Sequence, residues 1–242
     1  MIHALVCGCD YKGESFELPD CELDATNVAA RLKRFVGDVV LLRGKDVIKA
    51  AIIDQVHTIA DRKADYEPVF AYFSGHGTTA NVGGKTIQGI VLNDGTVFWE
   101  NELRALFEKI SPAVFAVDAC FCFGLARGKR KLARYVPFEL LAPRPISPAA
   151  AIEVDKPRYY YAACNTNETA DSTGKGGAFT NVLLPLLDRI NSQTTFASLY
   201  TAIRMKLPSK QHRQTPQFYC RKKEWAAQKI LAAANQWNKH PR

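Results

Sequence analysis

The sequence predicts an α/β protein built on a mainly parallel, six-stranded sheet with helices on both faces. Short apolar runs rich in Val, Ile, Phe and Tyr alternate along the chain with segments of helical periodicity, an order typical of a parallel sheet. These runs are continuous, as expected for strands that are buried on both faces. Hydrophobic residues make up 47% of the 242 residues, so we expect one domain over residues 1–242 with a substantial core.

The first elements follow a strand–helix–strand–helix order. Residues 2–9 form an apolar run and predict a buried strand. Residues 24–35 place apolar side chains on one face at helical spacing, and the next apolar run predicts a strand over 39–42. A second helix is expected over 46–60. A helix between two strands favours their parallel pairing, because parallel strands need a crossover connection.

The middle of the chain continues the alternation. A third strand is expected over 68–73, and the glycine-rich stretch 78–94 after it predicts a hairpin. A helix over 100–109 and a fourth strand over 113–117 follow. This fourth strand leads directly into Asp118, so both the third and the fourth strands end at polar or reactive residues.

The second half begins with a long irregular segment, residues 125–157, which is rich in proline and basic residues. We expect it to be a flexible linker. The elements predicted beyond it are a strand over 158–163, helices over 178–189 and 196–205, a strand over 217–220 and a closing helix over 222–237.

Two residues with the chemistry of thiol catalysis follow the third and fourth strands. His76 comes just after the third strand and Cys120 just after the fourth, so both are expected at the carboxyl edge of the sheet, where α/β proteins bind ligands. A thiolate is the attacking form of cysteine, and a nearby imidazole both promotes its formation and protonates a leaving amine. Gly77 permits close backbone approach, and its N–H with that of Cys120 is a candidate oxyanion hole.

Several separate segments together resemble the caspase-like clan of cysteine peptidases, and most closely its metacaspase and orthocaspase members. Tyr72–Gly77 reads YFSGHG, Asp118–Cys120 reads Asp-x-Cys, and Leu18–Ala25 is similar to the clan's LxGCxxDA segment. His76 also precedes Cys120 by close to the separation of about 50 residues seen in caspases. Further similar segments are Tyr161–Cys164, Glu168–Ala170, Gly176–Thr180 and Gln214–Gln217.

The resemblance implies a three-layer α/β/α sandwich and a cysteine endopeptidase with Cys120 as nucleophile and His76 as its catalytic partner. It further implies that Asp24, Asp118 and Cys21 line the S1 pocket, as in metacaspases that cleave after Arg or Lys. Two neighbouring carboxylates are favourable when a cation lies between them. Asp24 as a helix N-cap and Asp118 as an anchor for a neighbouring loop are the structural alternatives. An Asp-specific, caspase-like preference is a further alternative.

The resemblance also implies self-processing after the nucleophile. In this clan the connection between the large-subunit-like and small-subunit-like parts is a frequent cleavage site. Here the linker carries the basic residues that the proposed S1 pocket would accept, and a solvated basic surface is the alternative interpretation. The candidate cleavage residues are Arg127, Lys129, Arg130, Lys131 and Arg134.

One departure from the clan concerns the residues after the nucleophile. The clan continues Cys-His-Ser-Gly, whereas Cys120 is followed here by Phe-Cys-Phe-Gly. Cys122 is therefore a rival nucleophile, although Asp118 favours Cys120 by its register. The departure leaves a catalytically inactive caspase-fold binding module as an alternative function.

A second departure concerns calcium, which many metacaspases bind through clustered carboxylates. Calcium prefers six to eight oxygen ligands. The comparable stretch here offers Asp94, Glu100 and Glu102, with Asn101 in place of an acid. We therefore expect no metal and no other cofactor.

Composition restricts the partners. The net charge of +8 lies largely in two basic segments without interleaved aromatic residues, so nucleic-acid binding is disfavoured and peptide or protein substrates are expected.

The seven cysteines include no CxxC pair and suggest reduced, mostly buried thiols. No apolar stretch reaches the length of a membrane span or a signal sequence, so we expect a cytoplasmic protein. The oligomeric state stays open.

Overall fold

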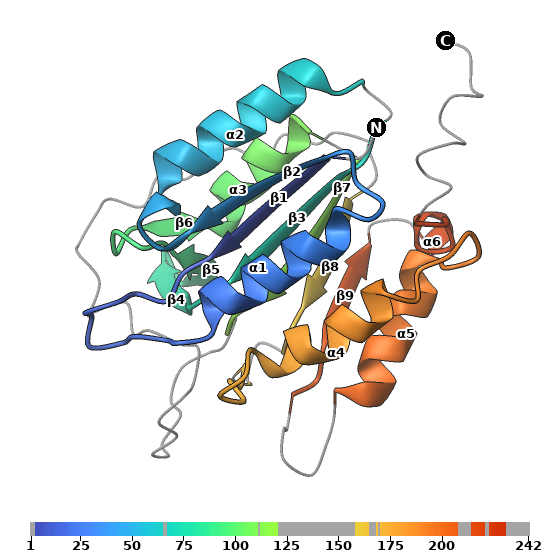
Figure 1. The fold of residues 1–242 in the computed structure, drawn as a ribbon. Coiled ribbons are helices and arrows are strands. Elements are labelled where there is room, and N and C mark those ends of the chain that lie inside the picture. The colour runs from blue at the N-terminus through green and yellow to red at the C-terminus, as the bar shows by residue number, and fades with distance from the viewer. Residues whose placement is uncertain are drawn as a thin grey trace.

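A six-stranded sheet runs through the centre of the computed structural model (Figure 1). Its strand order is β2-β1-β3-β7-β8-β9, and β9 alone pairs antiparallel to its neighbour. All six predicted strands are present, which confirms the mainly parallel sheet. The strands are β1 (His3–Gly8), β2 (Asp38–Arg43), β3 (Val69–Ser74), β7 (Ala113–Asp118), β8 (Arg158–Ala162) and β9 (Gln217–Cys220).

The structure describes residues 3–64, 67–110, 112–120, 158–164, 168, 170–207, 214–220 and 223–230. The predicted linker over 125–157, its basic cleavage candidates and Cys122 lie outside these residues. Among the described helices, none is long and apolar enough to cross a membrane.

Helices cover both faces of the sheet and complete the predicted three layers (Figure 1). One core lies between the sheet and α2 (Lys49–Arg62) with α3 (Glu100–Glu108). The other core lies between the sheet and α1 (Cys21–Leu32), α4 (Ala178–Leu187) and α5 (Phe196–Lys206).

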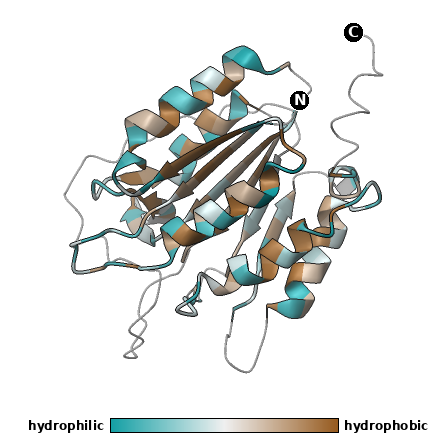
Figure 2. Cartoon of the chain, in the orientation of Figure 1, coloured by the Kyte–Doolittle hydropathy of each residue, from teal (hydrophilic) through white to brown (hydrophobic). Residues whose placement is uncertain are grey.

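The two cores explain the apolar sequence of the strands. Every residue of β1 and of β7 is buried, because side chains on both faces of the sheet meet a helical layer. The covering helices are hydrophobic toward the sheet and hydrophilic outward (Figure 2). In α1 the inward residues are Ala25, Val28 and Leu32, as the spacing predicts.

The start of α1 differs from the prediction. The helix begins at Cys21, three residues before the predicted start at Asp24. The N–H of Glu22 donates to the carboxylate of Asp10 at 2.8 Å, which satisfies a first-turn donor that would otherwise lack an intrahelical acceptor. Asp24 therefore lies inside α1 and does not cap it.

A second, three-stranded antiparallel sheet branches off after β3. It contains β4 (Gly77–Val82), β5 (Lys85–Val91) and β6 (Val97–Trp99). The predicted hairpin is confirmed as β4 and β5, and its two turn residues, Gly83 and Gly84, have φ angles of 58° and 77°. Such angles suit the two-residue turn of a tight hairpin. The sequence analysis missed β6, which is only three residues long.

The predicted closing helix is wrong in part. Helix α6 (Lys223–Ala226) ends after four residues, and the described residues 227–230 form a turn and a bridge. Ile230 donates its N–H to Thr194 at 2.8 Å, and Phe196 donates its N–H to Gln228 at 3.2 Å. These backbone groups are bonded to residues at the start of α5 and just before it, so the helix does not continue through them.

Candidate active site

The two predicted catalytic residues follow adjacent strands. In the parallel pair of β3 and β7, Ser74 lies opposite Asp118. The N–H of Gly75 donates to the carbonyl of Asp118 at 3.2 Å, so the chains stay together beyond the strands. His76 and Cys120 each come two residues after this last pair. The structure therefore brings both residues to the same edge of the sheet, as the strand order predicts.

Gly77 lies directly against the backbone of Cys120. A Cβ atom added to Gly77 would lie 1.5 Å from the carbonyl oxygen of Cys120, a distance that no side chain can tolerate. This close approach requires glycine. The contact supports the expected proximity of the two residues, while the role of their N–H groups in binding an oxyanion stays a prediction.

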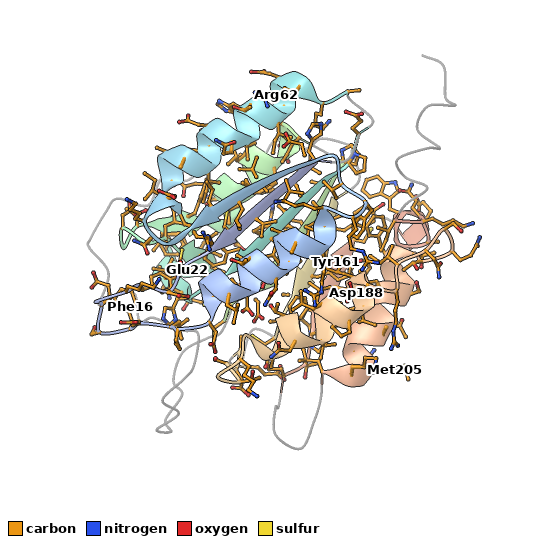
Figure 3. All side chains as sticks on the ribbon, in the orientation of Figure 1. Phe16, Glu22, Arg62, Tyr161, Asp188 and Met205 are labelled. Atoms are coloured by element: carbon orange, nitrogen blue, oxygen red, sulfur yellow. The ribbon has the colours of Figure 1, made fainter. Side chains whose placement is uncertain are left out.

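The imidazole of His76 is buried between the residues that follow β1. Its Nε2 lies 2.6 Å from the carbonyl oxygen of Phe16, in the loop at the carboxyl end of the sheet (Figure 3). A carbonyl oxygen only accepts, so Nε2 must carry the proton in this contact. In the neutral ring Nδ1 then has the lone pair and can act as a base. The rings of Phe16 and Tyr11 lie 5.7 and 4.9 Å from the imidazole, centroid to centroid.

The thiol of Cys120 is fully buried beneath the chain that follows β8. Its side chain has 0% exposure, and its sulfur accepts the N–H of Ala170 at 3.1 Å. The segment that contains Ala170 lies against the sulfur, and Cys120 has no exposed surface, so a substrate can reach the thiol only after its surroundings move.

The two predicted S1 carboxylates converge on the start of α4. Asp24 accepts the N–H of Gly177, the residue that caps α4, at 2.9 Å, and the hydroxyl of Ser74 at 2.8 Å. Asp118 accepts both the N–H and the hydroxyl of Thr180, at 3.0 and 2.6 Å. Anionic groups are stabilised at a helix N-terminus, where backbone N–H groups and the helix dipole meet them.

These contacts are similar to the structural roles considered above, a helix N-cap for Asp24 and a loop anchor for Asp118, but the partners differ. Asp24 caps α4 rather than its own helix, and Asp118 anchors the first turn of α4 rather than a loop. Both side chains are buried, at 1% and 0% exposure. Cys21, three residues before Asp24 in α1, is also fully buried, and its carbonyl packs against Gly8 of β1. Asp24 and Asp118 thus both contact the start of α4, and Cys21 packs against β1.

Three residues at the site were missed by the sequence analysis. Tyr11, Phe16 and Ala170 contact His76 or Cys120, and two of them do so through backbone atoms that any residue type supplies. No residue pattern encodes such contacts. One signal could have found Tyr11: it follows the first strand directly, and so lies at the sheet edge where the site was expected.

Two of the three acids in the stretch expected to lack a calcium site are engaged in other contacts. Both carboxylate oxygens of Glu102 accept from Lys49, at 2.8 and 2.9 Å, and Glu102 also accepts the N–H of Trp99. Asp94 accepts the N–H and the hydroxyl of Thr96. Within the described ranges, no three His, Cys, Asp or Glu side chains are grouped as metal ligands would be.

The remaining thiols have the character expected of core residues. The cysteines that the structure describes form no disulfide with one another, and among them only Cys220 is partly exposed. Burial raises the pKa of Cys7 to about 12, so this thiol stays protonated and unreactive.

Comparison with known proteins gives one family and many structures. The family model described as the caspase domain matches residues 1–224. A crystal structure of a protein from Geobacter sulfurreducens has a TM-score of 0.76 at 21% identity, covering 95% of this chain and 98% of that one. Caspase-1 from Spodoptera frugiperda has a TM-score of 0.63 at 15% identity, covering 90% and 85%. These two likenesses concern the fold. The search of curated proteins found no match.

Proposed function

The chain belongs to the caspase-domain family of cysteine peptidases, and on that premise we propose that it is an endopeptidase using a Cys120–His76 dyad. The observation that carries the proposal is the contact between Nε2 of His76 and the carbonyl of Phe16 at 2.6 Å. This contact leaves Nδ1 as the basic nitrogen of a ring that lies beside the strand end bearing Cys120.

The reaction follows from these groups. Nδ1 of His76 takes the thiol proton, and Sγ of Cys120 attacks the scissile carbonyl to form a tetrahedral oxyanion. The N–H groups of Gly77 and Cys120 are proposed to bind that oxyanion. The imidazolium then protonates the departing amine, and a thioester remains. Water, deprotonated by His76, attacks the thioester and regenerates the thiol.

Cleavage after Arg or Lys is the proposed specificity, as in metacaspases. Asp24 and Asp118 bring two negative charges to one buried region, and the N-terminus of α4 offsets them only in part. A guanidinium or ammonium at P1 would complete the compensation, whereas an Asp side chain would add a third negative charge. Rates on two fluorogenic peptides, one with Arg and one with Asp at P1, test both the activity and this preference.

A catalytically inactive binding module is the second candidate. The observation that favours it is the complete burial of Cys120 beneath Ala170. The same pair of peptides separates the candidates, because a binding module hydrolyses neither. We favour a latent enzyme, in which the segment after β8 must move before substrate enters.

Self-processing of the linker is the step that we propose to activate the latent enzyme. In chain order, the proposed linker joins Cys120 to β8 and thus to the segment that covers the thiol. A cut in this connection would release a tether between the two. Basic residues in the linker also match the proposed S1 pocket.

We expect purified protein to cleave itself within residues 127–134. Exposed irregular chain is the preferred substrate of a peptidase, because helices and strands must unfold before they enter its groove. The products are an N-terminal fragment ending at Arg127, Lys129, Arg130, Lys131 or Arg134 and its complement, which stay associated through the shared pairing of β7 with β8. Intact-mass measurement over time detects both fragments.

Cys120→Ala is the control for this cleavage and should remain whole under the same conditions. A wild type that hydrolyses Arg peptides yet stays intact would contradict self-processing. Cleavage of the Cys120→Ala protein would instead assign the cut to a contaminating protease.

Activity without calcium is a further expectation. Lys49 pairs with Glu102 at 2.8 Å, and Asp94 is engaged with Thr96, so these acids are poorly placed to share a cation. Peptide hydrolysis should therefore be unchanged by excess EGTA. Loss of activity with EGTA and its recovery on addition of calcium would show that a site exists elsewhere.

The proposed setting is that of a single catalytic domain in the cytoplasm, acting on peptide or protein substrates. The free thiols of the described cysteines support a reducing compartment.

A further inference from the structure

Tyr11 occupies an unusual position directly after β1. Among the described residues it is the only non-glycine residue with a positive φ, at 54°. Its side chain is nevertheless fully buried, at 1% exposure, and reaches across the sheet edge to the segment between β3 and β4. Side chains rarely adopt this backbone conformation unless the surrounding structure requires it, and such residues concentrate at functional sites.

The hydroxyl of Tyr11 is inserted into the antiparallel ladder of β4 and β5. The register pairs Gly77 with Ile90, which places His76 opposite Val91 as the next pair. Val91 donates its N–H to the carbonyl of His76 at 2.9 Å, so half of an ordinary hydrogen-bonded pair is present. The other half is interrupted.

In the interrupted half, the N–H of His76 donates to the hydroxyl of Tyr11 at 2.8 Å, and that hydroxyl donates to the carbonyl of Val91 at 2.7 Å. The hydroxyl thus takes the place of a direct bond from His76 to Val91. It holds the backbone of His76 away from β5 while satisfying both buried groups.

The ring of Tyr11 supports the same side chain. Its centroid lies 4.9 Å from that of the imidazole, and the ring of Phe16 lies 5.5 Å from Tyr11. Gly75 leaves the space for the hydroxyl, because a Cβ there would lie 2.5 Å from it. Burial raises the pKa of Tyr11 well above its ordinary value, so the hydroxyl keeps the proton that it donates to Val91.

We propose that Tyr11 is a positioning residue for His76: its hydroxyl, inserted between His76 and Val91, and its ring hold the imidazole against the carbonyl of Phe16. The inference rests on the proposed peptidase function, in which His76 moves the protons. Without the hydroxyl, the direct ladder bond can close and draw the backbone of His76 toward β5. The imidazole then leaves the carbonyl of Phe16, and Nδ1 loses its orientation.

The test compares Tyr11→Phe with Tyr161→Phe. Tyr161 is an equally buried tyrosine of β8 (Figure 3), and its hydroxyl donates to the backbone carbonyl of Phe196 at 2.9 Å. Both variants lose one buried hydroxyl that donates to a carbonyl. Tyr11→Phe also loses the bond that the hydroxyl accepts from His76, which a direct bond from His76 to Val91 can replace. We expect Tyr11→Phe alone to lower kcat on an Arg peptide, by between about tenfold and a hundredfold, with KM unchanged.

A measurement without substrate keeps this inference separate from the proposed function. In ¹⁵N-histidine NMR spectra, wild type and Tyr161→Phe should show His76 as the Nε2–H tautomer, and Tyr11→Phe should show a mixture of tautomers. If wild type cleaves no peptide, the proposed function fails, but this comparison still tests the positioning. An unchanged His76 tautomer in folded Tyr11→Phe, or a raised KM with unchanged kcat, would overturn the inference.

Discussion

Replacement of Cys120 or His76 by alanine should reduce peptide hydrolysis by at least about a hundredfold. Without Cys120 no thioester forms, and we expect a loss of at least about 10⁴-fold in kcat/KM. Without His76 the thiol lacks its base and the leaving amine lacks its acid, which costs about 10² to 10⁴-fold. Initial rates on an Arg peptide measure both losses.

Two other cysteines serve as controls for this result. Cys164→Ala removes a buried thiol that donates to the carbonyl of Glu168 at 3.3 Å, so it repeats the loss of core packing without removing the nucleophile. Cys122→Ala tests the rival nucleophile, and both variants should keep most of their activity. Alkylation followed by mass spectrometry identifies the reactive thiol directly, and a label on Cys122 in place of Cys120 would show that the assignment is wrong.

Asp118→Asn should have the second-largest effect, on Arg substrates. A single oxygen of Asp118 accepts both the N–H and the hydroxyl of Thr180. The side-chain oxygen of asparagine can accept the same two bonds, so the substitution removes the charge and keeps them. Loss of one charge from a desolvated pair costs about 2 to 5 kcal/mol, which corresponds to a fall in kcat/KM of at least about thirtyfold. Asp24→Asn should act in the same direction.

Asp20→Asn is the matched control. Asp20 is also buried, and it accepts the hydroxyl of Ser172 in the segment before α4, but it is not among the proposed S1 residues. Thermal unfolding of each variant reports the cost in stability separately from kcat/KM. If Asp118→Asn lowers only the melting temperature and leaves the rate on Arg peptides unchanged, its role is confined to α4, and the S1 assignment is wrong.

The backbone architecture could be predicted closely from local patterns. The strands of the main sheet are continuous apolar runs because both faces are buried, and this pattern is visible without any knowledge of tertiary contacts. The errors lie where local pattern and tertiary contact compete. The sequence around Gln228 has helical periodicity, but its backbone bonds to residues at and just before the start of α5 end the helix. Strand β6 is too short to show a periodic pattern.

The placement of His76 and Cys120 was predictable for a topological reason. Parallel strands place their carboxyl ends on one edge, so a histidine after β3 and a cysteine after β7 must share that edge if the two strands are neighbours. The chemistry of thiolate and imidazole then follows from residue type. Neither conclusion needs side-chain coordinates.

The contacts around that pair depend on residues that are distant in the sequence and have no shared pattern. Asp24 meets Gly177, Cys120 meets Ala170, and the hydroxyl of Tyr11 is inserted between His76 and Val91. Residue type and strand order therefore determine the fold class, the sheet edge and the reacting groups. Only tertiary packing decides the burial of the thiol, the contacts of the two carboxylates and the orientation of the imidazole. The reason is that many of these contacts are hydrogen bonds to backbone atoms. Such bonds depend on geometry and not on the identity of the residue that supplies them.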